Sequence, residues 1–139
     1  MSVTVMERFP NLSFLSAEVI NGGNFSDYLD GGGGNDQLRG GKGNDKLIGG
    51  KGNDILFSEK GKDKLIGGEG NDIFKLSTGK GFDLIQDFKD KQKKIFIGSL
   101  KKLKLKNKGK DVYIYKGKDL LASVNGAKGL LSKKGKYLI

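Results

Sequence analysis

The sequence predicts an all-β protein in which a coil of short parallel strands is followed by antiparallel strands. Three observations support this. A glycine-rich motif returns every nine residues in the first half of the 139-residue chain, an apolar residue returns with the same period, and the second half alternates apolar and polar residues. Glycine accounts for 24 residues and proline for one, so the glycines serve defined backbone geometries and not a Pro/Gly-rich linker.

The nine-residue motif reads GGxGND in four copies, which begin at Gly31, Gly40, Gly49 and Gly67. Two further copies, at residues 22–27 and 58–63, keep the aspartate but have lost glycines. Glycines at the first, second and fourth positions of such a loop are expected to adopt positive φ and to bring carbonyl oxygens close together.

The apolar series begins at Ile20 and lies two residues after each aspartate of the motif. Its other members are Leu29, Leu38, Leu47, Leu56, Leu65 and Phe74. A six-residue loop and a three-residue strand with its middle side chain inward predict one turn of a flattened coil for every two nonapeptides. This core is thin compared with the entropy lost in ordering so much glycine, so a further source of stability is required.

The composition excludes several kinds of site. The chain has no cysteine and no histidine, which removes disulfides, Cys/His zinc sites, thiol catalysis and Ser-His-Asp hydrolysis. Any metal must therefore be held by oxygen. No nucleophile or acid–base pair is apparent, so we expect no enzyme activity. Residues 1–20 lack the pattern of a secretory signal, and no apolar run is long enough to span a membrane.

Residues 21–88 resemble the RTX family of hemolysin-type calcium-binding repeats, whose nonapeptide matches the four GGxGND loops. The resemblance implies a right-handed parallel β-roll with several Ca²⁺ ions. Each ion would lie between successive turns, bound by an aspartate from each loop and by backbone carbonyls. The residues expected to form these sites are Gly31, Gly32, Gly34, Asp36, Gly40, Gly41, Gly43, Asp45, Gly49, Gly50, Gly52, Asp54, Asp63, Gly67, Gly68, Gly70, Asp72, Asp27 and Asp83.

Two nonapeptides make one turn of the coil, so the aspartates are expected to alternate between two edges. Asp36, Asp54 and Asp72 share one edge, and Asp27, Asp45 and Asp63 share the other. The loops of the first edge are all intact, which predicts two well-formed sites there and weaker sites on the second edge.

The repeat pattern slips by two residues after Phe74, and an acidic and apolar stretch ends in Asp87-Phe88. This resembles the segment that closes RTX arrays, so Asp83 or Asp87 is expected to complete a last site facing Asp72. Members of the family often carry a further Gly and Asp before the next strand, where this chain has Lys91-Gln92-Lys93-Lys94.

Charge divides the chain near residue 88. Residues 1–88 carry a net charge of −3, whereas residues 89–139 contain 16 lysines and three aspartates, a net charge of +13. We expect an N-terminal cap over residues 1–16, a calcium-binding β-roll over residues 17–88 with its first strand at residues 17–21, and a basic, β-rich C-terminal cap over residues 89–139.

The C-terminal cap is predicted to contain a three-stranded antiparallel meander over residues 101–124. Turns are expected at residues 107–110 and 116–119, and the meander would close the open end of the roll. Residues 137–139 either pair as a last strand or remain free.

The leading functional hypothesis is a calcium-binding RTX module that folds on calcium outside the cell, as a type I secretion C-terminal region. The alternative is a calcium-dependent module for acidic polysaccharides, like those of alginate epimerases, or for an anionic cell surface, which would use Lys102, Lys104 and Lys106. A third possibility is the tail of a larger enzyme or toxin. Nucleic acid is not an expected partner, because a basic region with tyrosines is only a generic footprint.

Overall fold

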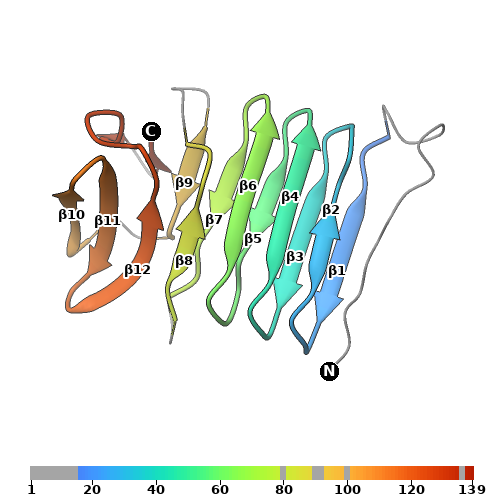
Figure 1. Cartoon of the computed structure of the whole chain (residues 1–139), viewed down its shortest axis with the longest axis horizontal. Coiled ribbons are helices and arrows are strands. Elements are labelled where there is room, and N and C mark those ends of the chain that lie inside the picture. Colours follow the sequence, from blue (N-terminus) through green and yellow to red (C-terminus); the bar gives the residue numbers. More distant parts are fainter. Residues whose placement is uncertain (1–15, 79–80, 89–92, 99–100, 135–136) are drawn as a thin grey trace.

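A computed structural model describes residues 16–78, 81–88, 93–98, 101–134 and 137–139. The strands of these residues form two seven-stranded sheets, and no helix occurs among them. Figure 1 shows the strands stacked side by side along the long axis, with β1 at one end and β10 at the other. The all-β prediction is confirmed. Within this described part, no helix exists that would be long and apolar enough to cross a membrane.

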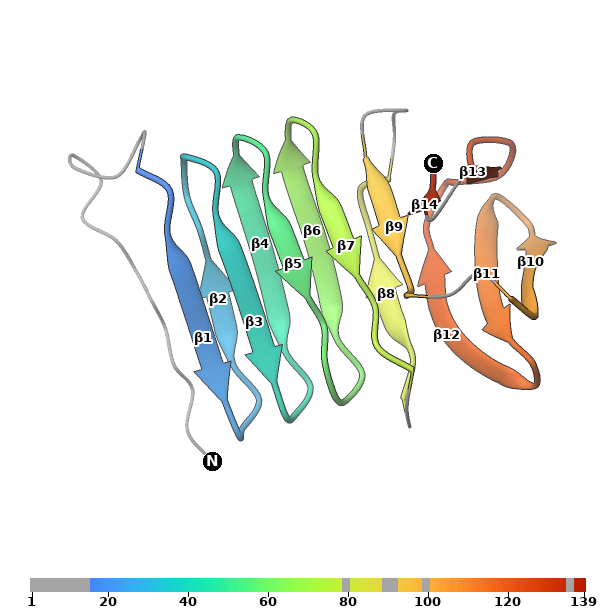
Figure 2. The ribbon, with the colours of Figure 1, turned by 180° about the vertical axis from the view of Figure 1, so that it is seen from behind.

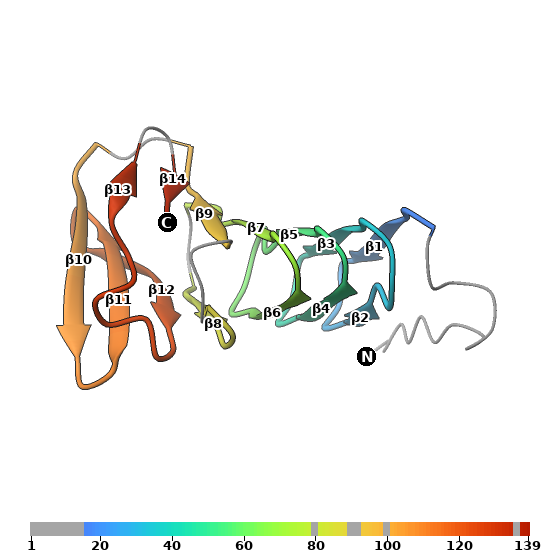
Figure 3. The ribbon, with the colours of Figure 1, turned by 90° about the horizontal axis from the view of Figure 1, so that it is seen from above.

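The first part of the chain is a flattened parallel coil that alternates between the two sheets at each strand. One sheet contains β1 (Val19–Gly23), β3 (Gln37–Gly41), β5 (Ile55–Phe57), β7 (Ile73–Lys75) and β9 (Lys94–Phe96). The other contains β2 (Tyr28–Asp30), β4 (Lys46–Lys51), β6 (Lys64–Glu69) and β8 (Asp83–Ile85). Viewed from above, the two sets of strands lie on opposite sides of the coil (Figure 3).

The register confirms a coil with two nonapeptides per turn. Leu38 pairs with Leu56, and Leu47 pairs with Leu65, in parallel ladders. The predicted slip after Phe74 is also present, because Leu65 pairs with Ile85 and Phe74 pairs with Ile95. The last turn of the coil is therefore longer than the others, and its parallel pairing extends beyond residue 88.

The apolar series forms the core of the coil, as predicted. Its members Ile20, Leu29, Leu38, Leu47, Leu56, Leu65 and Phe74 are all buried. Phe88 extends this core, with its ring centroid 6.4 Å from that of Phe74. Each strand contributes one inward side chain of this stack, so the hydrophobic gain per coil is small.

The C-terminal strands form the predicted meander, β10 (Leu103–Lys108), β11 (Asp111–Lys116) and β12 (Asp119–Val124), paired antiparallel. The meander does not lie across the end of the roll. It extends one sheet edge to edge, because β12 pairs in parallel with β8. Figure 2 shows it beyond β8 and β9, at the end opposite β1.

The edge of the other sheet is covered by the last residues of the chain. Strand β14 (Tyr137–Leu138) pairs antiparallel with β9, and β13 (Lys133–Lys134) pairs with β14. Of the two alternatives for the C-terminus, pairing as a last strand is the one observed. The expected N-terminal cap falls almost entirely on residues 1–15, outside the described residues, and the first strand begins at Val19.

Candidate metal centre

The aspartates of the repeats form two rows, one on each edge of the coil. We call Asp36, Asp54 and Asp72 the first row, and Asp27, Asp45, Asp63 and Asp83 the second row. From the second aspartate of each row onward, the Oδ1 atom accepts the backbone N–H of the preceding aspartate of the row, over 2.8 to 3.1 Å. The two edges are the ones that the nine-residue period predicts.

The second carboxylate oxygen behaves differently. The Oδ2 atoms of Asp45, Asp54 and Asp63 are buried and find no hydrogen-bond donor among the described residues. Burial raises the pKa of Asp54 to about 6 and that of Asp63 to about 7, and it also raises the pKa of Asp45. A buried carboxylate oxygen without a donor is costly, and a bound cation removes this cost.

Backbone carbonyls converge on the same points. A Cβ atom added to Gly49 would overlap Asp54 Oδ2 and would lie 2.6 Å from the carbonyl oxygen of Gly67, in the next coil. A Cβ atom at Gly31 would lie 2.5 Å from Asp36 Oδ2 and 2.6 Å from the Gly49 oxygen. Each hollow therefore contains a carboxylate oxygen of one loop and a carbonyl oxygen of the following loop.

The geometry corrects one expectation about the glycines. The second and fourth glycines of the loops have positive φ, for example 106° at Gly50 and 122° at Gly52. The first glycines, at residues 31, 40, 49 and 67, do not. They are required for a different reason, because their missing side chain leaves room for the oxygen-lined hollow.

The chemistry of these hollows fits calcium. Among the described residues no three acidic side chains gather in one place, so the carbonyls must supply the remaining ligands. Calcium accepts six to eight oxygen ligands in flexible geometry and commonly combines carboxylates with carbonyls. Magnesium requires a tighter octahedron.

The asparagines at the fifth loop position form a second ladder that was not predicted from the sequence. The Asn35 side-chain oxygen accepts the Asn53 N–H over 2.8 Å, and the Asn53 oxygen accepts the Asn71 N–H over 2.8 Å. The invariant fifth position of the four GGxGND copies was the signal for this ladder. It ties successive loops together on the outside of the carboxylate row.

The second row differs from the first in its downstream loop. Ser58 and Glu59 replace the first two glycines there, and Glu59 adopts a positive φ of 63° that favours glycine. At the end of this row Asp83 Oδ1 accepts the Asp63 N–H over 3.1 Å. Burial raises the pKa of Asp83 to about 6.

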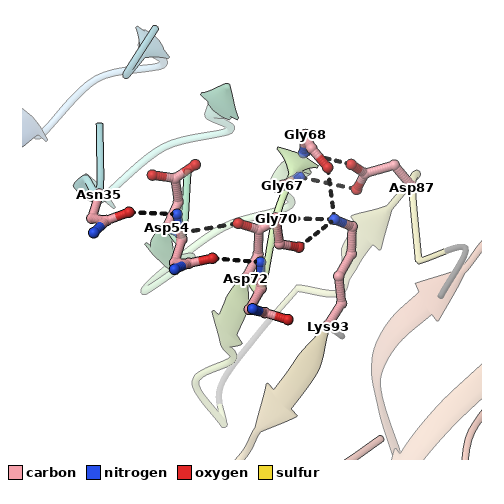
Figure 4. Close-up of polar contacts among 10 residues, drawn as sticks. Asn35, Asp54, Gly67, Gly68, Gly70, Asp72, Asp87 and Lys93 are labelled. Carbon is pink, nitrogen blue, oxygen red and sulfur yellow. Dashed lines mark hydrogen bonds and ion pairs between the residues drawn. The ribbon is translucent and has the colours of Figure 1, made fainter. Parts of the chain in front are cut away.

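Of the two residues expected to face Asp72, Asp83 does not lie there. The two extra residues after Phe74 place Asp83 behind Asp63 instead. Asp87 lies beside the Asp72 loop, where its two carboxylate oxygens accept the N–H groups of Gly67 and Gly68. The group that contacts Asp72 Oδ2 is the ammonium of Lys93, with Nζ at 2.8 Å (Figure 4).

Comparison with known proteins agrees with this geometry. The family model of the RTX calcium-binding nonapeptide repeat matches residues 15–47 and 41–74, with four copies. The solution structure of the AlgE6R2 subunit of a mannuronan C5-epimerase from Azotobacter vinelandii is similar, with a TM-score of 0.58 and 29% identity over 80% of this chain and 87% of that chain. No curated protein matches the chain. Residues 15–74 of this chain therefore belong to the RTX family of calcium-binding nonapeptide repeats, folded as a parallel β-roll.

Proposed function

We propose that this chain is a non-catalytic module that folds when its aspartate rows bind calcium. The observation that supports this most directly is the hollow shared by Asp54 Oδ2 and the Gly67 oxygen, in which a buried carboxylate atom lacks a donor among the described residues. The aspartates of both rows, from Asp27 to Asp83, and the glycine carbonyls of the four intact loops would hold the ions, except at Asp72 Oδ2, which already contacts the ammonium of Lys93.

The roll has little to stabilise it without a cation. Its core gains one apolar side chain per strand, and its glycine-rich loops lose much entropy on ordering. The stacked carboxylates of each row also repel one another, which contributes to the raised pKa of Asp54 after the larger effect of burial. Bound calcium would supply the neutralising charge, so the binding free energy becomes folding free energy.

We further propose that folding is coupled to location. Calcium is scarce in the cytosol and millimolar outside the cell, so the chain would stay unfolded before export and fold afterwards. This behaviour fits a type I secretion C-terminal region. A reporter protein fused to this chain should therefore appear in the medium of bacteria that carry a type I exporter. A reporter found only inside those cells would contradict the export proposal.

Calcium-dependent folding has a direct test. In excess chelator at neutral pH the circular dichroism should be coil-like, and calcium should produce a β-rich spectrum cooperatively at roughly 0.1 to 1 mM, the range of extracellular modules. Magnesium at the same concentration should not substitute. A chain that is equally β-rich in chelator would contradict the proposal.

A second candidate function is binding of an acidic polysaccharide by the meander. Lys104, Lys106 and Lys108 are exposed on the edge strand β10. Lys106 Nζ lies 5.0 Å from the Tyr115 ring centroid, and Lys108 Nζ lies 5.5 Å from that of Tyr113. Cations held over aromatic rings on one sheet face suit a chain of charged sugars. The similar module named above is part of a mannuronan C5-epimerase.

The structure changes which lysines this candidate uses. Lys102 was expected on the strand with Lys104 and Lys106, but it lies in the turn before β10 with a φ of 59°. The basic row along the strand therefore begins at Lys104.

Replacing Lys104 and Lys106 with glutamine is expected to weaken binding of the calcium-loaded protein to an alginate column at about 0.15 M salt, where exposed charges still interact over about 8 Å. The matched control replaces the exposed Lys128 and Lys134, which removes the same charge elsewhere. The salt needed for elution should fall only for the first variant. Equal losses for both variants would show that binding reflects net charge alone.

A further inference from the structure

A buried ammonium group lies at the downstream end of the first row. Lys93 is 2% exposed. Its Nζ atom lies 2.7 Å from the Gly68 carbonyl oxygen, 3.3 Å from the Gly70 carbonyl oxygen and 2.8 Å from Asp72 Oδ2 (Figure 4). The three oxygens belong to the second, fourth and sixth positions of the last intact loop.

The aspartate one coil upstream shows what is different here. Asp54 Oδ2 has the same place in its loop as Asp72 Oδ2, but no donor among the described residues reaches it, and it faces the Gly67 oxygen of the next coil. After Asp72 no further repeat loop follows on this edge. Lys93 contacts Asp72 Oδ2, which is the atom equivalent to the donor-free Asp54 Oδ2 of the upstream loop.

Asp87 completes this end of the row. In the first intact loop, the Gly31 N–H donates to the Ile48 oxygen of the next coil over 2.9 Å. In the last loop, the corresponding Gly67 N–H and that of Gly68 donate to Asp87 over 2.9 and 2.6 Å. The carboxylate of Asp87 thus satisfies the donors of the last loop, and the ammonium of Lys93 satisfies its acceptors.

A lysine suits this position better than a calcium ion. An ammonium has three donors and one charge, which matches two carbonyls and one carboxylate oxygen. Calcium needs six to eight oxygens, and the three protein oxygens around Nζ fall short of this number.

We propose that Lys93 is a resident cation that takes the place of calcium at the end of the first row. It closes the last loop without metal, so this end of the roll provides an ordered surface on which the calcium-filled coils stack. The inference rests on the proposed function, in that calcium must fill the hollows upstream of Lys93.

The test converts the lysine into a calcium ligand. Lys93→Glu places a second carboxylate opposite Asp72, and native mass spectrometry at saturating calcium should find one more ion per chain than in the wild type. Lys94→Glu is the matched control, because Lys94 is the exposed neighbour in β9 and carries the same charge. Its ion count should equal that of the wild type.

A second variant measures the contribution of the charge to folding. Lys93→Met removes the ammonium and leaves Asp72 without a cation. Breaking a buried ion pair is strongly destabilising, and this cost is divided among the several calcium ions that bind as the chain folds. The calcium midpoint of folding should therefore rise about threefold or more. Lys94→Met should leave the midpoint unchanged. An unchanged midpoint in Lys93→Met, or an unchanged ion count in a folded Lys93→Glu chain, would overturn the proposal.

If Lys93→Glu does not fold, a structure of the wild-type protein tests the proposal instead. A calcium-loaded crystal structure should show Nζ on Asp72 Oδ2 with no ion there, and an ion that displaces Nζ from this carboxylate would overturn the proposal. These results separate the two hypotheses. A wild type that binds no calcium contradicts the proposed function, whereas calcium upstream together with an ion at Asp72 contradicts only the role of Lys93.

Discussion

Asp54→Asn is expected to raise the calcium midpoint of folding about tenfold, and Asp63→Asn is expected to raise it by less. Asparagine keeps an oxygen that can accept the Asp36 N–H, but its amide group presents donors to the hollow that Asp54 Oδ2 shares with the Gly67 oxygen. The Asp63 loop has Ser58 and Glu59 in place of two glycines, with Glu59 at a positive φ of 63°. A weaker site there loses less when its carboxylate is removed.

Circular dichroism during calcium titration measures both midpoints, with Asp119→Asn in the meander as the control for removal of one negative charge. Asp119 is exposed and lies outside both rows, so its variant should titrate like the wild type. Equal shifts for Asp54→Asn and Asp63→Asn, or the reverse order, would show that the two edges do not differ as the loops predict.

The repeats could be predicted from the sequence because their structure is set locally. In a coil with two nonapeptides per turn, every strand pairs with the strand two motifs away, so the period alone gives the register of Leu38 with Leu56. The same period places each aspartate behind the preceding one in its row. The strand register therefore does not depend on contacts between residues far apart in the sequence. The thin core requires only one apolar residue per strand.

The end of the roll could not be predicted in the same way. Past Phe74 the pairing partners lie further apart along the chain than two nonapeptides, as in Leu65 with Ile85 and Phe74 with Ile95. The period no longer determines which side chain faces Asp72. Lys93 lies in a run of lysines that has the composition of a solvated surface, and only the path of the chain buries it.

The glycines show a related limit. The sequence identifies the first, second and fourth loop positions as glycine but does not distinguish their reasons. Gly50 and Gly52 need a positive φ, whereas Gly49 is needed because a side chain would fill the hollow beside Asp54. The two reasons predict different consequences for a substitution, a backbone strain in one case and a blocked cation site in the other.

Acidification is expected to replace calcium in part, so the metal-free protein should gain β structure as the pH falls from 8 to 5. Burial raises the pKa of Asp54 and Asp83 to about 6 and that of Asp63 to about 7, from 3.8 in the unfolded chain. Between about pH 4 and pH 7 the folded state therefore binds more protons than the unfolded state, and its stability decreases as the pH rises through this window. Circular dichroism and thermal unfolding in excess chelator measure this slope.

The same carboxylates should give calcium binding the opposite dependence on pH, because a proton and a calcium ion compete for them. In metal-free chains that are folded at pH 6.5, Asp63 is mostly protonated because burial raises its pKa to about 7, so calcium binding to these folded chains should release about one proton each, whereas at pH 8.5 it should release almost none. Calorimetry in buffers of different ionisation enthalpy measures this release, and Asp63→Asn should reduce it. A metal-free stability that increases from pH 5 to pH 7 would contradict the argument, because it would mean that the buried carboxylates are stabilised in their charged form without a metal.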